Sequence, residues 1–461
     1  MMKILIISLG CDKNLVDTEK MMAGLMSGLP SGSALEREGI EFTDDEEQCD
    51  AVLVNTCCFI GDAKVESIDT LIQMGELKKN PDYPMKYLIA AGCLVKRYRD
   101  EMLKEIPEID GLVDLNSLSC LGQMLSDLYD GKTICQEDYL IPDQTECMTD
   151  RIQTTGGYSS YLKIADGCDK HCTYCVIPKV RGAYRSYPME SLLEEAQKLA
   201  ESGVKELILV AQEITCYGTD LYGEKRLPEL LHGLCRIEGL QWIRLLYCYP
   251  EEITDELIDV IRDEKKIVHY IDMPIQHASD PILKRMGRRT DSKAIREVIG
   301  KLRKEIPDIA IRTTLISGFP GETEEDHEAV LEFVDEMEFD RLGVFAYSRE
   351  EDTPADLMPD HLEEEVKQAR RNEIMELQQE IAFEKGSARI GTVMDVMIEG
   401  KVSGESAYVG RSYMDAPGID GLVFVHAPYE RILMSGDIVP VTVTGSDEYD
   451  LIGELQNESA E

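Results

Sequence analysis

The stretch YLKIADGCDKHCTYCVIPKVRG (Tyr161–Gly182) carries the signals that decide the fold. It begins with the apolar run Tyr161–Ala165, which is typical of a buried β-strand. Cysteines with the spacing C-x3-C-x2-C follow this run at Cys168, Cys172 and Cys175. Thiolates grouped in this way bind iron–sulfur clusters. The stretch therefore predicts a strand whose carboxyl end carries a cluster-binding loop.

A structural zinc site is the alternative for these cysteines, and it would need a fourth ligand nearby. The next cysteine, Cys216, lies far along the chain, and His171 lies inside the loop, where its backbone is tied to two ligands. Three cysteines on a cluster of four irons leave one iron open, and an open iron can chelate the amino and carboxylate groups of a small molecule. The pattern therefore favours an iron–sulfur cluster over zinc.

The segment after this loop alternates strand-like and helical patterns. Helical stretches such as Glu190–Ser202 and Asp291–Glu305 separate the apolar runs, and Val366–Phe383 is typical of a closing helix. Such alternation predicts a parallel sheet, here a full or partial βα barrel with its chemistry at the carboxyl ends of the strands. The candidate strands are Tyr161–Ala165, Glu206–Val210, Trp242–Tyr247, His269–Met273, Ile311–Ile316 and Leu342–Tyr347.

Several polar or glycine-containing groups near the ends of these strands could face the site. Each also has a structural interpretation: side-chain packing, a surface loop, a hydrogen-bonded histidine or a turn that needs glycine. The groups are Tyr174, Gln212–Glu213, Gln276–His277 and Gly318–Gly321 with its central Pro320. We assign no side chain as a catalytic residue from the sequence.

The first hundred residues predict a second parallel sheet, because apolar runs again alternate with the helical patterns Val16–Leu29 and Ala63–Lys79. Carboxyl ends of parallel strands meet at one edge of a sheet, so thiols that follow them can converge. A cysteine can also be simply a small buried residue. The strands are Lys3–Leu9, Ala51–Thr56 and Tyr87–Ala91, and the cysteines just past their ends are Cys11, Cys57 and Cys93.

Two further cysteines compete for a place in this second group. Cys58 follows Cys57 directly, but successive residues of a strand point to opposite faces, so both cannot point inward together. Cys49 is the more distant competitor. The long stretch Ser27–Glu47, which includes Pro30, Gly32 and Gly39, is expected to be an enlarged loop of unknown role.

The end of the chain has a different pattern, with short β-type runs separated by Gly, Pro and Asp. It predicts a small all-β domain, a five-stranded barrel. Together with the polar linker Ile134–Thr155, this divides the chain into an N-terminal α/β domain at 1–150, a βα barrel at 151–385 and a small β-barrel at 386–461. The β-type runs are Thr392–Ile398, Ala407–Gly410, Leu422–Val425 and Ile438–Thr444.

Charge and cysteine content limit the function. The chain has 461 residues with 48 Lys and Arg against 89 Asp and Glu, so its net charge is −41. This disfavours a large phosphate-binding surface and permits a basic partner. No apolar run reaches the roughly 18 residues of a membrane span, and Ile4–Ile7 is too short for a signal peptide. We expect a cytoplasmic protein without a membrane partner, whose cysteines bind metal or act in catalysis.

The chain resembles the radical S-adenosylmethionine methylthiotransferases over nearly its whole length, and within them the branch that modifies a ribosomal protein. The resemblance is carried by SLGCDKNLVDTE (Ser8–Glu19), NTCCF (Asn55–Phe59), AAGC (Ala90–Cys93), CDKHCTYCVIPKVRGAYRS (Cys168–Ser186), MPIQHASDPILKRMGR (Met273–Arg288), ISGFPGET (Ile316–Thr323) and GRSYMDAPGIDG (Gly410–Gly421). It implies a radical S-adenosylmethionine barrel in the centre and a TRAM domain at the end.

The resemblance also implies two 4Fe–4S clusters and S-adenosyl-L-methionine as cofactors. It assigns Cys11, Cys57 and Cys93 to one cluster. It assigns Cys168, Cys172 and Cys175 to the cluster that binds S-adenosylmethionine. The implied reaction replaces a C–H bond by C–SCH3, and it needs an electron donor and a source of sulfur. No ordinary side-chain base deprotonates an unactivated carbon, so radical chemistry is the plausible route.

Two substrates compete within the resemblance: the β-carbon of an aspartate in the twelfth protein of the small ribosomal subunit, and a modified adenosine in transfer RNA. From Gly386 to Glu461 the chain has four basic and thirteen acidic residues. An RNA-binding barrel needs a basic groove, whereas an acidic one attracts a basic ribosomal protein, free or within the ribosome. We therefore expect the protein substrate, with Asp415, Asp420, Asp447, Glu448 and Asp450 in loops or at strand ends where they could meet its Lys and Arg side chains. A remote alternative is an iron–sulfur electron carrier or scaffold without radical catalysis.

Overall fold

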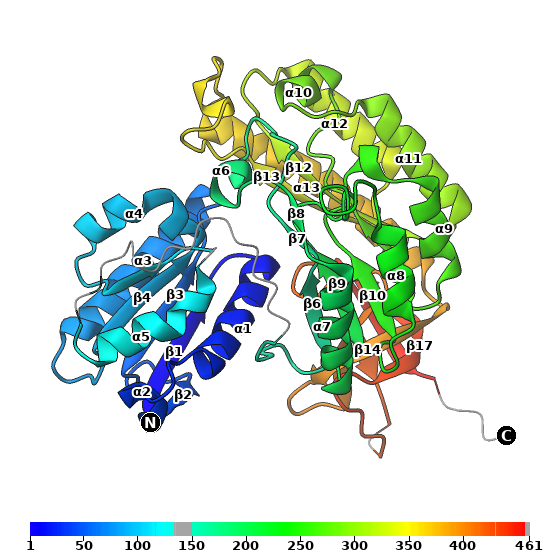
Figure 1. The fold of residues 1–461 in the computed structure, drawn as a ribbon. Helices are drawn as coiled ribbons and strands as arrows, with labels where there is room; N and C mark the ends of the chain where they lie inside the picture. Colours follow the sequence, from blue (N-terminus) through cyan, green and yellow to red (C-terminus); the bar gives the residue numbers. More distant parts are fainter. Residues whose placement is uncertain (116, 133, 135–149, 429, 457–461) are drawn as a thin grey trace. The chain divides into compact units, whose positions relative to one another are not determined.

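The computed structural model describes residues 1–115, 117–132, 134, 150–428 and 430–456 (Figure 1). Residues 135–149 of the predicted linker lie outside this set. The chain forms two compact units. Unit 1 consists of Met1–Thr154, Tyr161–Glu195 and Ser348–Thr353, and unit 2 consists of Thr155–Ser160, Ala196–Tyr347 and Pro354–Glu461. Unit 1 therefore contains both groups of cysteines that the sequence singles out.

Unit 1 is built on a parallel sheet with the strand order β2-β1-β3-β4-β5 among the described residues. Its central strand is buried along its whole length, as an apolar run in a sheet covered on both faces should be. The predicted strands are confirmed to within two residues at each end. The strands are β1 (Met2–Ser8), β2 (Ile40–Thr43), β3 (Ala51–Thr56), β4 (Tyr87–Gly92) and β5 (Gly111–Val113).

The expectation that Ser27–Glu47 forms an enlarged loop is wrong. The segment contains the short helix α2 (Ala34–Glu38) and the edge strand β2. Strand β2 pairs in parallel with β1, with Met2 opposite Ile40. Its residues IEFT alternate apolar and polar side chains over only four positions, which is too short a pattern to be distinguished from a loop in the sequence.

Helices cover the sheet of unit 1. Helix α1 begins four residues earlier than predicted, at Asp12, because Cys11 has extended backbone angles and serves as its N-cap. After strand β6 (Ser159–Lys163), the short strands β7 and β8 pair with each other, and the segment between them contains the cysteine loop and helix α6. The other elements of unit 1 are α1 (Asp12–Ser27), α3 (Gly61–Lys79), α4 (Cys93–Glu105), η1 (Leu118–Cys120), α5 (Leu121–Tyr129), β7 (Ala165–Asp166), α6 (Ile177–Val180), β8 (Arg185–Ser186) and α7 (Met189–Glu201), the last of which ends in unit 2.

Six parallel strands form an open sheet in the order β13-β12-β11-β10-β9-β6 among the described residues, which confirms the predicted partial βα barrel. The remaining strands are β9 (Glu206–Val210), β10 (Trp242–Leu245), β11 (Ile267–Asp272), β12 (Ala310–Ser317) and β13 (Arg341–Ala346). The helical elements are α8 (Leu227–Cys235), η3 (Pro250–Glu252), α9 (Asp255–Asp263), α10 (Asp280–Arg285), α11 (Ser292–Glu305), α12 (Glu324–Met337), η4 (Ala355–Leu357) and α13 (Glu364–Ala388). Within the described ranges, no helix is long and apolar enough to cross a membrane.

The predicted five-stranded barrel is confirmed: the last strands close in the order β14-β15-β16-β18-β17. The sequence pattern missed its last strand, whose residues DLIGEL contain two acids and a glycine. The strands are β14 (Val393–Lys401), β15 (Ala407–Ser412), β16 (Val423–His426), β17 (Ile438–Asp447) and β18 (Asp450–Leu455).

Within unit 2 the small barrel is fixed to the sheet by buried ion pairs. Glu206, at the start of β9, lies between Arg244 (2.9 Å) and Arg411 (2.6 Å). Asp420 accepts hydrogen bonds from Tyr270 (2.7 Å) and Arg312 (3.3 Å). Glu206 begins β9 and Arg312 is the third of eight residues in β12, so the small barrel covers the amino-terminal ends of these two strands.

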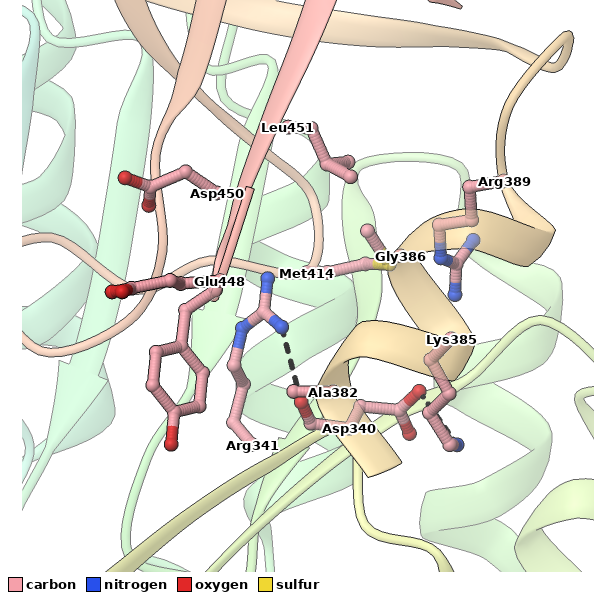
Figure 2. A pocket seen from close by; sticks show the side chains of 11 residues that line it. Asp340, Arg341, Ala382, Lys385, Gly386, Arg389, Met414, Glu448, Asp450 and Leu451 are labelled. Carbon is pink, nitrogen blue, oxygen red and sulfur yellow. Dashed lines mark hydrogen bonds and ion pairs between the residues drawn. The ribbon is translucent and has the colours of Figure 1, made fainter. Parts of the chain in front are cut away.

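A small cavity of about 20 Å³ at this junction shows how closely the parts pack. Figure 2 shows Arg341 beside Glu448 and Asp450, with its guanidinium hydrogen-bonded to the backbone oxygen of Asp340 (3.1 Å). A space of this size holds no more than a water molecule. The junction between the small barrel and the sheet is therefore closely packed around this cavity.

The sequence suggested that Asp415 and Asp420 could meet basic groups of a partner, and this expectation is wrong. Asp415 is 1% exposed and pairs with Arg341, whose Nε lies 3.0 Å from its carboxylate. A buried carboxylate without a partner would cost several kcal/mol. Arg341 and Arg312 supply these partners for Asp415 and Asp420 inside unit 2. Asp447 and Glu448 are exposed, as expected.

Candidate functional site

Three cysteines lie together at the carboxyl edge of the unit 1 sheet, as the sequence predicts. Cys11 follows β1, Cys57 follows β3, and Cys93 follows β4 as the first residue of α4. Gly10 makes the approach possible: it has φ +90°, and a Cβ there would lie 2.8 Å from the sulfur of Cys57. A side chain at position 10 would therefore separate the first two thiols.

Two opposite effects act on the ionisation of these thiols. Burial raises the pKa of Cys57, and it raises the pKa of Cys93 to about 11, with the neighbouring thiols adding to both effects. Cys11 and Cys93 lie at the amino ends of α1 and α4, where the helix dipole favours negative charge. The buried thiols therefore need a nearby positive charge to ionise.

The donor set fits an iron–sulfur cluster, because three soft sulfur ligands come from three adjacent strand ends. Within the described part of the chain, no three His, Cys, Asp or Glu side chains are placed to hold a single metal ion. The fit therefore rests on the type and placement of the donors and not on a closed coordination shell.

The two competing cysteines have different surroundings. Cys49 precedes β3 and so lies at the opposite edge of the sheet, where its thiol hydrogen-bonds to the backbone oxygen of Glu46 (3.3 Å). Cys58 is fully buried and packs among apolar residues of the core. The pKa of the Cys58 thiol is affected by the charges of Cys93, Arg97 and Cys57, whereas that of the Cys57 thiol is affected by the charge of Cys11. This placement favours Cys57 over both competitors.

The C-x3-C-x2-C loop is held by its own backbone. The Cys168 amide donates to Gly182 (3.2 Å), and the Cys175 amide donates to Cys172 (3.0 Å). Gly167 has φ +77°, and a Cβ there would lie 2.1 Å from the backbone oxygen of Ala183, so the loop requires glycine.

Cys168 and Cys172 are buried and Cys175 is partly buried. Burial also raises the pKa of Cys175, and the charges of Cys172 and Cys168 add to it. His171 has left-handed backbone angles and an exposed side chain, which does not support the zinc alternative.

A buried charged network that the sequence analysis missed connects the two cysteine groups inside unit 1. Its centre is Arg181, which is 4% exposed and lies six positions after Cys175. Arg181 pairs with Asp166 (3.1 Å) and Asp17 (3.0 Å), and Lys163 pairs with the same two carboxylates. These charges stand inside the quoted motifs, but no local pattern indicates that segments so far apart in the chain meet.

Two residues that follow strands of unit 2 have backbone angles that non-glycine residues rarely adopt. Tyr247 and Gln276 follow β10 and β11 with positive φ, at 63° and 72°. Such backbone costs about 1–3 kcal/mol per residue and is concentrated at functional sites. Glu213 is buried after β9 and accepts a hydrogen bond from the Thr215 amide (2.8 Å). The buried Oε1 of Gln212 has no hydrogen-bond partner among the described residues.

Two of the other candidate groups in unit 2 have structural partners. The Nδ1 of His277 accepts a hydrogen bond from the Ser279 amide (3.0 Å), and its Nε2 lies 3.4 Å from Glu322. Glu322 also accepts the amides of Gly318 (2.7 Å) and Phe319 (3.0 Å). These contacts support the hydrogen-bonded histidine and the glycine turn among the alternatives.

The outer face of the small barrel has an open hollow of about 340 Å³. Its floor is partly apolar, with Phe424 and Ile452 from neighbouring strands, and carboxylates lie at its rim. We call it the barrel groove. It is lined by Val402, Glu405, Ala407, Phe424, His426, Asp447, Asp450 and Ile452.

The chain matches three family models. They are the Radical SAM superfamily at residues 162–334, the Uncharacterized protein family UPF0004 at 3–114, and the TRAM domain at 390–455. The UPF0004 match ends just past strand β5, and the TRAM match covers the small barrel. Each predicted part of the chain therefore has a family match of its own.

Similar proteins cover the whole chain. The Ribosomal protein uS12 methylthiotransferase RimO of Lachnoclostridium phytofermentans is 57% identical over 98% of this chain and 99% of its own length. The protein of the same name from Clostridioides difficile is 47% identical over 100% of both chains. Among solved structures, the radical S-adenosylmethionine methyltransferase TsrM from Kitasatospora setae has a TM-score of 0.55 at 15% identity over 77% of each chain. This likeness shows a shared fold.

Proposed function

The chain belongs to the family of ribosomal protein uS12 methylthiotransferases, and from this membership we propose that it replaces a C–H bond by C–SCH3 at the β-carbon of an aspartate in uS12. It is an enzyme of the radical S-adenosylmethionine class. The observation that carries the proposal is the identity of up to 57% over the full chain, with a thiol triplet at the end of strand β6 and another at the edge of the unit 1 sheet.

We assign a 4Fe–4S cluster to each triplet. Cys168, Cys172 and Cys175 hold the cluster that binds S-adenosylmethionine, and Cys11, Cys57 and Cys93 hold the second. When bound, the first cluster with S-adenosylmethionine would supply the radical that removes a hydrogen atom, a second S-adenosylmethionine would supply the methyl group, and the second cluster would hold the sulfur. An electron donor and a sulfur source complete the reaction.

The chain's own residues hold and shield these groups. Ser67 on α3 fixes Cys57 from both sides, since its hydroxyl accepts the Cys57 amide (3.0 Å) and donates to the Cys57 backbone oxygen (3.0 Å). Asn14 joins the ends of two strands by donating to the backbone oxygens of Leu9 (2.9 Å) and Thr56 (3.1 Å). These hydrogen bonds make the strand ends rigid and keep the ligands in place.

We propose that the barrel groove of the TRAM domain binds the basic uS12 protein, free or within the ribosome, in the cytoplasm. Exposed Glu405 and Asp447 give the groove a negative rim. Arg411, one of only four basic residues after Gly386, is buried against Glu206 and adds no positive charge to the surface. Complementary charge steers a basic protein toward such a rim and repels nucleic-acid phosphates.

Mass spectrometry of ribosomes and transfer RNA from a strain that lacks this gene tests the function. We expect uS12 to lose the mass of one methylthio group, and plasmid-borne wild type, but not Cys93→Ala, to restore it. An unchanged uS12, with a methylthio group missing from transfer RNA instead, would overturn the proposal in favour of the RNA substrate. No change in either would favour the electron-carrier alternative.

A further inference from the structure

One side chain, Arg181, links the C-x3-C-x2-C loop to the thiol group formed by Cys11, Cys57 and Cys93. The Nη2 of Arg181 donates to the Oδ1 of Asn14 (2.6 Å), and the positive charge of Arg181 lowers the pKa of the Cys93 thiol against the effect of burial. The Cys93 sulfur itself lies 3.9 Å from the same Asn14 oxygen. Arg181 thus contacts the side chain that joins the ends of β1 and β3, and this side chain lies beside the thiol after β4.

The other partners of Arg181 make its position rigid. Its Nη1 donates to both oxygens of Asp166 (3.1 Å each), in the strand that enters the C-x3-C-x2-C loop, and its Nη2 donates to Asp17 (3.0 Å) on α1. Planar, fully paired guanidinium groups of this kind are fixed in orientation as well as in charge. The side chain is buried, so solvent does not screen its charge from the thiols.

We infer that Arg181 is a positioning residue for the second cluster: it orients Asn14 beside Cys93 and holds a positive charge near the ligand sulfur, which makes that cluster easier to reduce. The inference rests on the proposed assignment of Cys11, Cys57 and Cys93 as ligands. Net charge is among the features that set the reduction potentials of iron–sulfur clusters. The loop of one cluster would thereby control the potential of the other.

Lys163 provides a matched control. It is equally buried and pairs with the same Asp17 and Asp166. The charges that act on it come from Asp166, Asp17, Tyr187 and Arg181, with no cysteine among them. Lys163→Gln therefore removes one positive charge from the same network, but not one that acts on a cluster ligand.

The experiment uses the full chain with Cys168, Cys172 and Cys175 changed to alanine, so that any remaining cluster is the second one. Iron content and the midpoint potential from an EPR-monitored redox titration are measured for this parent and for variants made in it. We expect Arg181→Gln to make reduction at least tenfold less favourable, a shift of about 59 mV to lower potential. Lys163→Gln should change it less than threefold.

Arg181→Lys keeps a charge beside the carboxylates and guards against loss of folding in Arg181→Gln. It should still make reduction at least threefold less favourable, because a lysine cannot reach Asp166, Asp17 and Asn14 together. Equal shifts in Arg181→Gln and Lys163→Gln, or an unchanged potential in both Arg181 variants, would overturn the inference alone. A folded parent without iron would overturn the proposed second cluster, and the inference with it.

Discussion

Cys57 and Cys58 are consecutive and both buried, and yet their thiols have different neighbours. Cys57 lies under Gly10 and beside Cys11, whereas Cys58 packs in the core and interacts with Arg97. We predict that Cys57→Ala abolishes methylthiolation of uS12 and removes iron from the second cluster. Cys58→Ala should keep both, at a cost of about 1 kcal/mol in stability. Iron analysis and mass spectrometry of the product measure this, and the reverse result would move the ligand by one residue.

Glu206 is a residue whose charge matters for stability. Burial raises its pKa, but Arg411 and Arg244 outweigh this and lower the pKa to about 2. The pKa of Glu206 in the folded protein is below the unfolded value of about 4.3. The stabilisation from its ion pairs is therefore present above pH 4.3 and is lost as the pH falls toward 2.

We predict that the thermal unfolding midpoint of wild type decreases as the pH is lowered from about 4.3 toward 2. About 3 kcal/mol of the free energy of unfolding at neutral pH is attributable to the ionised Glu206. Glu206→Gln should cost about 3–5 kcal/mol at pH 7, because it leaves two buried arginines without their anion. The loss between pH 5 and 3 should be smaller in this variant than in wild type. An equal acid dependence in both proteins would show that other carboxylates dominate.

The six cysteines that we assign to clusters could be singled out from the sequence, because each follows a strand that an apolar run reveals. Arg181, Asn14 and Asp17 could not be predicted as partners. Their contacts join positions more than a hundred residues apart, and hydrophobic periodicity reports only local structure. Asp415 and Asp420 were misplaced for the same reason: a sequence does not show which arginine will cover an acid.

At the scale of elements, a long apolar run was the surest sign of a strand. Strand β3, buried at all six positions, was predicted at its observed ends. Strands β2 and β18 lie at an edge or alternate with exposed residues, and they were missed. Their pairing with neighbours, not their composition, makes them strands, which is the usual effect of tertiary context on weak β propensity.

The proposed binding of uS12 to the barrel groove can be tested by removing the negative charges at its rim. We predict that Glu405→Gln with Asp447→Asn weakens binding of purified uS12 about three- to tenfold at low salt, since each exposed ion pair contributes up to about 1 kcal/mol. The loss should be mainly in the association rate and should disappear at high salt. Asp395→Asn with Glu430→Gln removes the same charge from exposed positions outside the groove lining and is the matched control.

Surface plasmon resonance at two salt concentrations measures both double variants. Glu405 and Asp447 are exposed, so neither substitution should change folding. If the control weakens binding as much as the groove variant, the whole acidic surface and not the groove attracts the partner. If neither variant nor salt changes binding, charge does not select the substrate and the RNA alternative gains support.

At the scale of the whole molecule, the two cysteine triplets belong to the same compact unit although 75 positions separate Cys93 from Cys168 in the sequence. Each is nevertheless held by its own backbone: strand ends of one sheet for Cys11, Cys57 and Cys93, and the closed loop from Gly167 to Gly182 for the others. Independent scaffolds imply that either cluster can form without the other.

We therefore predict that alanine at Cys168, Cys172 and Cys175 leaves about four irons per chain and abolishes cleavage of S-adenosylmethionine. Alanine at Cys11, Cys57 and Cys93 should also leave about four irons but keep the cleavage, because the loop that binds S-adenosylmethionine is intact. Neither variant should methylthiolate uS12, and mixing them should not restore the reaction, since both triplets must serve one substrate from one unit of one chain. Iron analysis, product chromatography and mass spectrometry measure the three properties. Loss of all iron from either folded variant would show that the two sites form only together.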